Sequence, residues 1–322
     1  MKKSLLVTLA DEHQIDQAKQ LFSSVYWNSG WKGDYMLLAY GIPEKKLRWF
    51  RKKGILIKKC RPIFRNENRF RSIVTCKFYM FVLEFKKWQN VVFLDSDIIV
   101  RASLDELAKV KGFAAVEEKI LADQFISFSG SEQDNVLLRN LKENYDLGEM
   151  RFNAGVVAFN TKIINKKVFP ELKRLFNFYK RINLLNDQSI LNLVFYKKWQ
   201  RLPLCYNVSP YLLAHPFFIR NIKKIPGIIL HFMSKRKPWD KGDPFNKEWR
   251  RNLEIAEFID VNKPVPARDF DKKAIMKISR RVKIKMLTYT PVRIMDRWAG
   301  LFGLVLKERC PKIYEKLKRL AN

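Results

Sequence analysis

The chain has 322 residues, of which 47% are hydrophobic and 13% aromatic, and its 63 basic and 32 acidic residues give a formal net charge of +31. This apolar content excludes disorder for most of the chain, because disordered sequences lack the residues that build a core. The length suits one large α/β domain with an appendage, or two modest domains. A positive surplus of this size indicates an anionic partner, which is nucleic acid, an acidic membrane surface or a phosphorylated substrate.

Apolar patterns predict strands that alternate with helices, an order typical of an α/β fold with a mainly parallel sheet. The predicted segments, in chain order, are a strand at 4–10, a helix from Ile15 to Val25, a strand at 35–41, a helix at 44–53, a strand at 55–60, a helix at 78–85, strands at 91–100 and 151–160, a helix at 168–180, a capped helix from Asn186, and a strand at 225–232. The segment VNKPVPARDF (261–270) contains two prolines and resembles a linker. We therefore divide the chain into a domain at 1–262 and a basic tail at 263–322.

The sequence shows neither a membrane span nor a signal peptide. The longest apolar run, Trp298 to Leu306, is about half of the ~18 residues that a spanning helix needs. The segment MKKSLLVTLADEH turns acidic at Asp11 and offers no small-residue cleavage site, so we expect a first strand there. The cysteines are widely spaced and show no zinc or disulfide pattern, which favours a reducing, cytoplasmic location. These cysteines are Cys60, Cys76, Cys205 and Cys310.

Positive charge is densest in the tail. Residues 272–322 hold 15 Lys or Arg and three acidic residues, a net charge of +12. Apolar residues recur there near helical spacing, with cations between them; they are Ile275, Ile278, Val282 and Met286. The apolar run WAGLFGLVL follows Pro291 and is flanked by Arg297, Lys307 and Arg309. A basic helix with an apolar face, Trp and Phe predicts an anchor on an anionic membrane surface.

Two other interpretations of the tail stay open. Its apolar residues can cover the rest of the protein, with the cations simply solvated. Nucleic-acid binding by the tail is less favoured, because contact with phosphate does not need large aliphatic side chains or Trp.

An acidic motif follows the most apolar predicted strand, in VVFLDSDIIV. Because strand side chains alternate, Asp95 and Asp97 can point the same way at the carboxyl end of the strand, where open α/β sheets bind ligands. Adjacent carboxylates repel unless a cation lies between them, and their hard oxygens suit Mg²⁺ or Mn²⁺. The alternatives are solvated turn aspartates, or the aspartyl nucleophile of a phosphatase-like hydrolase. That motif usually lies in the first strand and is followed by Gly and Thr, whereas Ile98 and Ile99 follow here.

Three further fragments contain residues that a purely structural role does not fully explain. His231 ends GIILHF and Lys237 follows six residues later, so an imidazole and an ammonium bracket a loop that can close over a diphosphate. The triplet Asn153-Ala154-Gly155 places a glycine inside an apolar strand, which favours either a close approach to the backbone or a bulge. Asp187 suits the first turn of a helix, whereas Gln188 has no local structural reason.

In this order and spacing, the fragments resemble glycosyltransferase family 8, which includes glycogenins and bacterial lipooligosaccharide galactosyltransferases. The resemblance covers roughly residues 4–245. It rests on VTLA, DSD, FNAGV, NDQSILN, CYN at 205–207 and HFMSKRKPW, with Lys77 in the place of the family's donor-contacting Lys or Arg. Two positions depart from the family pattern. Ser234 replaces a glycine of the last motif, and Gln14 stands where a tyrosine often lies against the nucleobase.

The resemblance implies a GT-A fold, in which a mixed nucleotide-binding sheet is flanked by helices. It also implies transfer of a hexose, glucose or galactose, from a UDP-sugar to a glycan or glycolipid acceptor with retention of anomeric configuration. By motif position, Asp95, Asp97 and His231 are expected to bind Mn²⁺, with Mg²⁺ as the other choice. The metal and Lys237 are expected to neutralise the departing UDP.

Further site residues follow from the same resemblance. Those expected to bind the donor are Thr8, Leu9, Ala10, Lys77, Ser96, Asn153, Ala154, Gly155, Ser234 and Lys237. Gln188 is expected beside the anomeric carbon, with Asp187 next to it, and these two are the expected catalytic residues.

One different class of function stays open, that of a nucleic-acid or anionic-surface binding protein with a degenerate transferase core. The charge supports it, but the sequence contains no recognised nucleic-acid module. We therefore expect no nucleic-acid partner, a lipid-linked glycan acceptor, and a peripheral location on the cytoplasmic face of a membrane.

Overall fold

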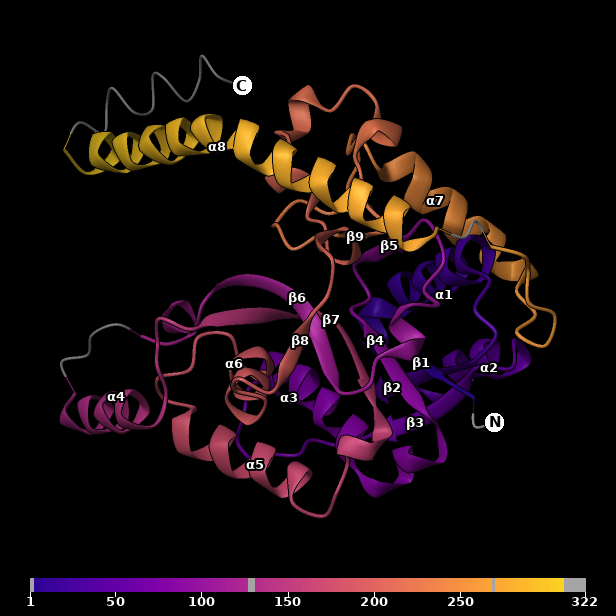
Figure 1. Cartoon of the computed structure of the whole chain (residues 1–322), viewed down its shortest axis with the longest axis horizontal. Helices are drawn as coiled ribbons and strands as arrows, with labels where there is room; N and C mark the ends of the chain where they lie inside the picture. The colour runs from indigo at the N-terminus through magenta and orange to yellow at the C-terminus, as the bar shows by residue number, and fades with distance from the viewer. Residues whose placement is uncertain (1–2, 127–130, 268–269, 310–322) are drawn as a thin grey trace.

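The fold is that of a computed structural model, which describes residues 3–126, 131–267 and 270–309 (Figure 1). A seven-stranded mixed sheet forms its centre, with strand order β3-β2-β1-β4-β7-β6-β8. These strands are β1 (Leu5–Asp11), β2 (Asp34–Tyr40), β3 (Leu56–Cys60), β4 (Asn90–Leu94), β6 (Phe113–Ile120), β7 (Met150–Asn160) and β8 (Trp199–Arg201). Strands β1 to β4 run parallel, as predicted, whereas β7 is antiparallel to both of its neighbours.

Helices cover both faces of this sheet, so the predicted α/β class is confirmed. The helices of the described residues are α1 (Ile15–Ser29), α2 (Glu44–Lys52), α3 (Arg69–Thr75), α4 (Glu132–Asn144), α5 (Val168–Tyr179), α6 (Asp187–Val194), α7 (Asn246–Glu254) and α8 (Lys272–Arg309). The side chains of β1 alternate between two cores: Leu5, Val7 and Leu9 join one, and Leu6 and Ala10 join the other. Burial on both faces explains why this strand is apolar throughout.

The segment 91–100, predicted as one strand, is two strands in two sheets. β4 ends at Leu94, the chain turns at Asp95-Ser96-Asp97, and β5 (Ile98–Val100) then pairs antiparallel with β9 (Ile229–His231). The prediction was wrong because Asp and Ser favour turns, and the turn here ends one strand before the next begins. The apolar residues on either side of the turn do not reveal that the two strands pair with different partners.

The segment 78–85 is also irregular. It belongs to two 3₁₀ helices, η2 (Cys76–Phe81) and η3 (Leu83–Lys87), which the extended residue Val82 separates. A 3₁₀ turn places residues three apart on one side, and Phe78 and Phe81 are both fully buried. The prediction of one helix here was therefore wrong. Strands β6 and β8 and helices α3, α4 and α7 were not predicted.

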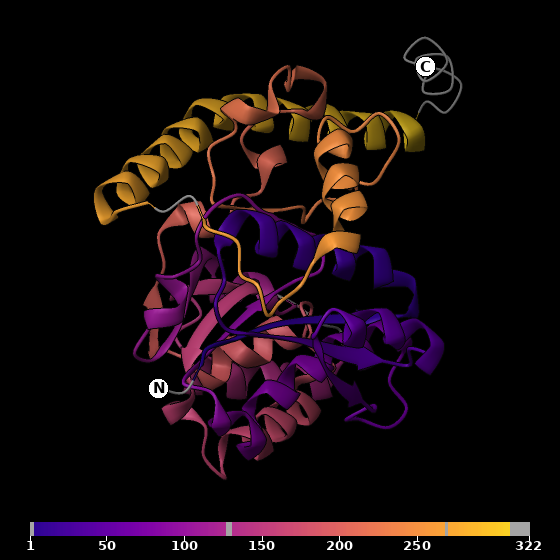
Figure 2. The ribbon, with the colours of Figure 1, turned by 90° about the vertical axis from the view of Figure 1, so that its right-hand side faces the viewer.

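The first half of the basic tail packs on the rest of the fold (Figure 2). Ile275 lies in the core that also contains α1 residues, and Val282 lies in a third core with residues of β5, β9 and α7. Ile278 and Met286 pack against the same two cores. The apolar face predicted for a membrane therefore covers the protein, which was the alternative interpretation of this pattern.

Other contacts also bind the tail to the domain. Ser279 Oγ accepts a hydrogen bond from Cys205 N at 3.3 Å. In the segment predicted as a linker, the carbonyl of Lys263 accepts a 2.7 Å hydrogen bond from the hydroxyl of Tyr26 in α1. A Cβ on Gly30, at the end of α1, would lie 2.6 Å from the Cβ of Ala267. Residues 261–267 and 270–286 are thus part of the folded unit, although the chain has no helix or strand between Phe258 and Lys272 among its described residues.

The rest of the tail is described only in part. Helix α8 continues through Pro291 to Arg309, so the backbone of WAGLFGLVL is helical. Residues 310–322, including Cys310, lie outside the described residues. No helix in the described ranges is both long enough and apolar enough to cross a bilayer. Of the described cysteines, Cys60, Cys76 and Cys205 are free and buried.

Replacement of Ile275 by alanine should lower the free energy of unfolding by about 3 kcal/mol, because the side chain is 5% exposed within a core. The matched change Ile284→Ala, at a position 59% exposed on the same helix, should cost less than about 0.5 kcal/mol. Urea unfolding followed by circular dichroism measures both. Equal losses in the two variants would contradict the docked position of α8.

Candidate functional site

Two carboxylates and an imidazole meet where β4 ends. One ligand atom each from Asp95, Asp97 and His231 lies within 4.8 Å of the others. His231 Nε2 lies 3.2 Å from Asp97 Oδ1 and 3.8 Å from Asp95 Oδ2. The register of the β5–β9 ribbon produces this meeting, because His231 pairs with Ile98, directly after the turn.

Two carboxylates and an imidazole fit a divalent metal such as Mn²⁺ or Mg²⁺. Both ions bind carboxylate oxygens, and Mn²⁺ also accepts an imidazole nitrogen. Asn207 Oδ1 lies 2.9 Å from His231 Nδ1, so the Nδ1–H tautomer would donate to this oxygen. That tautomer leaves Nε2, which faces the carboxylates, as a metal ligand. Asn207 belongs to the CYN motif, so the sequence contained a signal for it.

Gly155 makes room for this cluster. A Cβ at this position would lie 2.1 Å from His231 Cε1 and 2.8 Å from Asp95 Oδ2. The register between β6 and β7 also shifts here, from Ala115↔Val157 to Val116↔Asn153. Both interpretations of this glycine therefore hold, since the strand bulges and other atoms approach its backbone closely.

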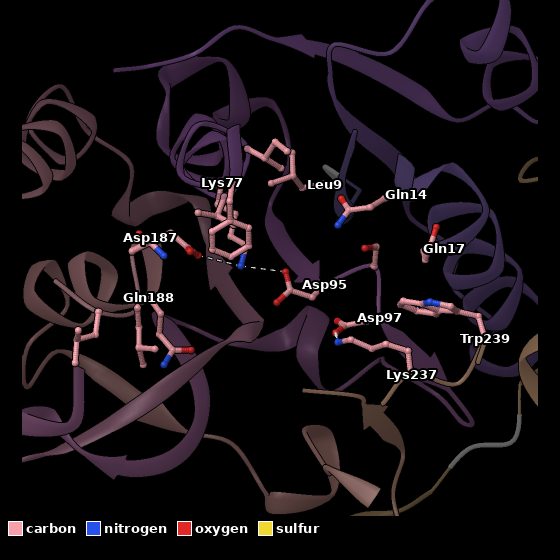
Figure 3. A pocket seen from close by; sticks show the side chains of 17 residues that line it. Leu9, Gln14, Gln17, Lys77, Asp95, Asp97, Asp187, Gln188, Lys237 and Trp239 are labelled. Carbon is pink, nitrogen blue, oxygen red and sulfur yellow. Dashed lines mark hydrogen bonds and ion pairs between the residues drawn. The ribbon is translucent and has the colours of Figure 1, made fainter. Parts of the chain in front are cut away.

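A buried lysine joins two carboxylates on opposite sides of the cleft (Figure 3). Lys77 Nζ lies 3.0 Å from Asp95 Oδ1 and 2.9 Å from Asp187 Oδ2, and Lys77 is 6% exposed. Burial alone lowers the pKa of Lys77, but Asp187 and Asp95 outweigh it and raise this pKa above its ordinary value. The ammonium therefore stays charged at neutral pH.

A second lysine pairs with the other metal-site carboxylate. Lys237 Nζ lies 2.7 Å from Asp97 Oδ2 and donates a 2.6 Å hydrogen bond to the carbonyl of Phe232. Burial raises the pKa of Asp97, but His231 and Lys237 together hold it well below its usual range. Asp97 is thus a carboxylate with a cation already beside it.

Gln188 and Asn153 satisfy backbone groups around the bulge of β7. Gln188 Oε1 accepts a 3.0 Å hydrogen bond from Ala154 N. Asn153 Oδ1 accepts from Gly155 N and from Asn207 Nδ2, each at 2.9 Å. Gln188 therefore has a structural reason, which comes from a strand 34 residues away and is invisible in local sequence.

Helix α6, which carries Gln188, begins next to the predicted residue but without the predicted cap. Asn186 has φ 51° and makes no side-chain hydrogen bond to the helix. Its Oδ1 accepts instead from Arg71 Nε at 2.9 Å. The prediction of a capped helix start was wrong, because the amide that could cap α6 pairs with α3.

A cleft of about 460 Å³ lies beside the two carboxylates of the metal-ligand cluster. The predicted site residues that line it are Leu9, Gln14, Lys77, Asp95, Ser96, Asp97, Asp187, Gln188 and Lys237. Gln17, Phe70, Val74 and Trp239 also line it and were not predicted as site residues. Gln17 lies one helical turn after Gln14, and Trp239 belongs to the KPW triplet, so both had a sequence signal.

Several predicted donor-site side chains lie elsewhere. Thr8 is fully buried and donates its hydroxyl to the carbonyl of Leu94 at 2.8 Å, and Ala10 is also fully buried. Ser234 donates its hydroxyl to the carbonyl of Arg236 at 2.8 Å, within its own loop. Asn153 lines a neighbouring pocket of about 190 Å³. Ala154 and Gly155 lie beside it in β7.

Comparison with known proteins places this cleft in a family context. The model of glycosyl transferase family 8 matches residues 42–242. Glycosyltransferase GlyA of Streptococcus pneumoniae serotype 4 (strain ATCC BAA-334 / TIGR4) is 24% identical over 260 residues, which cover 74% of this chain and 32% of GlyA. Glycosyltransferase GlyF of the same strain is 24% identical, over 92% of this chain and 74% of GlyF. The chain thus spans about a third of GlyA and three quarters of GlyF.

Among solved structures, galactosyltransferase LgtC in complex with donor and acceptor sugar analogs is similar. The superposition has a TM-score of 0.56 and 18% sequence identity, and it covers 81% of this chain and 97% of LgtC. This likeness shows the fold, which is the GT-A fold that the motifs implied.

Replacement of Gly155 by alanine should weaken Mn²⁺ binding at least tenfold, or about 1.4 kcal/mol, because the new Cβ displaces His231 or Asp95. Gly112→Ala is the matched control, since a Cβ there would meet only Gln200 Nε2 at an ordinary 3.7 Å. Titration calorimetry with Mn²⁺ measures both variants. Wild-type affinity in the Gly155 variant would show that His231 and Asp95 do not share a cation.

Proposed function

Because this chain belongs to glycosyltransferase family 8, we propose that it transfers a hexose, glucose or galactose, from a UDP-sugar to a glycan or glycolipid acceptor with retention of anomeric configuration. One observation carries the proposal: a cluster of two carboxylates and an imidazole presents both carboxylates to a cleft that two lysines also line. Such a cleft suits a diphosphate, which needs a metal and cations to balance its charge. An intact cluster also argues against a degenerate transferase core.

Asp95, Asp97 and His231 are the residues that would hold the metal. Mn²⁺, or Mg²⁺ in its place, would supply Lewis-acid stabilisation of the negative charge on departing UDP. Lys237 would stabilise the same negative charge. Its ammonium lies 2.7 Å from Asp97 Oδ2, and it would pair with a diphosphate oxygen in place of that carboxylate when the donor binds. Lys77 would hold Asp95 and Asp187 at a fixed separation, so that both keep their places when the donor binds.

The donor sugar would lie beside Lys77 and Asp187 in the cleft, with Asn153 contacting it from the neighbouring pocket. Gln188 would sit beside the anomeric carbon, where its amide oxygen can stabilise an oxocarbenium-like transition state. Its hydrogen bond from Ala154 N fixes that oxygen, so the group is already oriented before the substrate arrives.

The uridine would occupy the other end of the cleft, near Leu9 and Ser96. Gln14 lacks the aromatic ring that this family often places against the base. Trp239 lines the same end of the cleft beside Gln17 (Figure 3), so we propose that its indole supplies the stacking surface.

We also propose that residues 272–322 hold the enzyme peripherally at an anionic membrane surface, on its cytoplasmic face. The side chains of α8 that face solvent, rather than its buried face, would make this contact. Met276, Ile284 and Leu287 are 52%, 59% and 63% exposed. Cations lie among them on the same helix, and each Lys or Arg near such a surface contributes about 1 kcal/mol. This position would suit a lipid-linked glycan acceptor.

Asp97→Ala should abolish UDP release from UDP-glucose and UDP-galactose in the presence of Mn²⁺, because the metal loses a ligand. Asp105→Ala, which removes an exposed carboxylate that belongs neither to the cleft nor to the metal-ligand cluster, should leave UDP release unchanged. A coupled UDP assay and circular dichroism measure activity and folding. Unchanged Mn²⁺-dependent turnover in Asp97→Ala would refute the metal assignment, and no UDP release from wild type with any UDP-sugar would refute the transferase.

Gln188→Ala should lower kcat about a hundredfold while the affinity for UDP barely changes, because the amide acts on the transition state. Gln17→Ala should instead weaken the affinity for UDP while kcat barely changes, since Gln17 lies at the far end of the cleft, where the uridine is proposed to bind (Figure 3). Steady-state kinetics and calorimetry with UDP separate the two effects. A parallel loss of kcat and UDP affinity in Gln188→Ala would assign Gln188 a supporting role through Ala154.

A further inference from the structure

A second cavity lies at the opposite end of the β5–β9 ribbon from the metal-ligand cluster. Asp97 and His231 mark one end of the ribbon, and Arg101 and Gly227 mark the other. The ribbon has three residues in each strand, which corresponds to about 10 Å at roughly 3.3 Å per residue. At this second end, a groove of about 700 Å³ separates the loop at 222–227 from α8.

Among the described residues, cations line this groove and no carboxylate does. Lys223 and Lys224 come from the loop, and Arg281 and Lys285 come from α8. None of these four side chains forms an ion pair within the described ranges, whereas many other surface cations do, as Lys46 does with Glu12 at 2.8 Å. Four unpaired cations around one groove repel one another, so an anion shared between them would lower the energy of the fold.

A fifth cation, Arg101, gives the groove a fixed wall. Its Nε lies 2.8 Å from Glu248 Oε1, and its Nη1 donates to the carbonyls of Ile222 and Ile225 at 3.2 and 3.1 Å. Arg101 is therefore neutralised by Glu248 and holds the loop in place. The backbone of the loop that forms one wall of the groove is therefore fixed. The positive charge available to a ligand comes from the other four cations.

Exposed apolar side chains lie on the two segments that carry these cations. Ile284, which lines the groove, is 59% exposed, and Leu287 on the next turn of α8 is 63% exposed. The loop that leads to Lys223 carries Phe217 and Phe218, which are 82% and 73% exposed. Phosphate contact alone does not need these apolar groups, but a lipid surface offers phosphate and hydrocarbon together, and aromatic residues with cations favour that boundary.

We propose that this groove binds the headgroup phosphates of anionic phospholipids, with Arg281 as the planar donor and the lysines as point charges. The inference rests on the proposed membrane attachment and assigns that attachment a site. It is independent of the transferase chemistry. A bilayer held at this end of the ribbon lies about one ribbon length from the metal-ligand cluster, so the groove sets the distance between membrane and cleft.

The test uses the full chain and sedimentation with vesicles of phosphatidylcholine, with or without phosphatidylglycerol. Wild type should bind the phosphatidylglycerol vesicles, and added salt should weaken this binding. The double variant Lys224→Glu, Arg281→Glu should bind them at least tenfold more weakly. The control Lys162→Glu, Lys166→Glu makes the same change in net charge at exposed positions before α5 and should bind as wild type does. The charge-conserving variant Lys224→Arg should also bind as wild type does.

Equal binding by the groove variant and its control would overturn the groove while leaving a membrane contact elsewhere on the chain. Calorimetry with inorganic pyrophosphate and sedimentation with a DNA duplex cover the other sources of phosphate. If either ligand binds through these residues while the vesicles do not, the lipid assignment is wrong. UDP release without vesicles, measured on the same variants, should be unchanged. Absence of UDP release in wild type would refute the transferase alone, since the vesicle result still decides the groove.

Discussion

Mutual repulsion among the carboxylates of one cleft is the constraint on which this site depends. Asp95, Asp97 and Asp187 converge there, and an uncompensated buried charge costs several kcal/mol. Lys77 and Lys237 compensate them, with Nζ to carboxylate distances between 2.7 and 3.0 Å. The two lysines come from η2 and from the loop after β9, so the ion pairs connect four segments that are distant in sequence. The same contacts that keep the cleft folded also set the geometry of its metal ligands.

The side chains proposed for chemistry also support the backbone. Asn153 and Gln188 accept hydrogen bonds from the N–H groups of Gly155 and Ala154, where the register of β7 against β6 is broken. Asn207 connects Asn153 to the imidazole of His231. An unsatisfied buried N–H costs about 1–3 kcal/mol, so these side chains would be retained for folding alone. Loss of activity in a variant of Asn153 therefore does not by itself assign it to the reaction.

The sequence pattern predicted the strands that depend on neighbouring residues, but not the contacts between segments that are distant in sequence. The strands β1, β2 and β3 appear within a residue or two of their predicted bounds, because apolar runs between polar turns leave few alternatives. The meeting of Asp95, Asp97 and His231 was predicted from family motifs, but the turn that produces it was not, since an apolar run does not reveal its partner strand. The role of Gln188 in holding Ala154 depends on tertiary contact alone. The face of α8 that holds Ile275 and Val282 was misassigned, because an amphipathic pattern looks the same whether a core or a bilayer covers it.

Pro291 gives α8 two mechanically different parts. A proline has no N–H, so the carbonyl of Leu287 lacks its usual partner four residues on, and the helix is weakest at this point. Before it, Ile275 and Val282 fix the helix to the domain, whereas the part beyond it extends past the rest of the fold (Figure 1). The outer part, residues 292–309, is about 27 Å long at 1.5 Å per residue. The tilt of this outer part can therefore change at Pro291 while the buried turns of α8 stay in place.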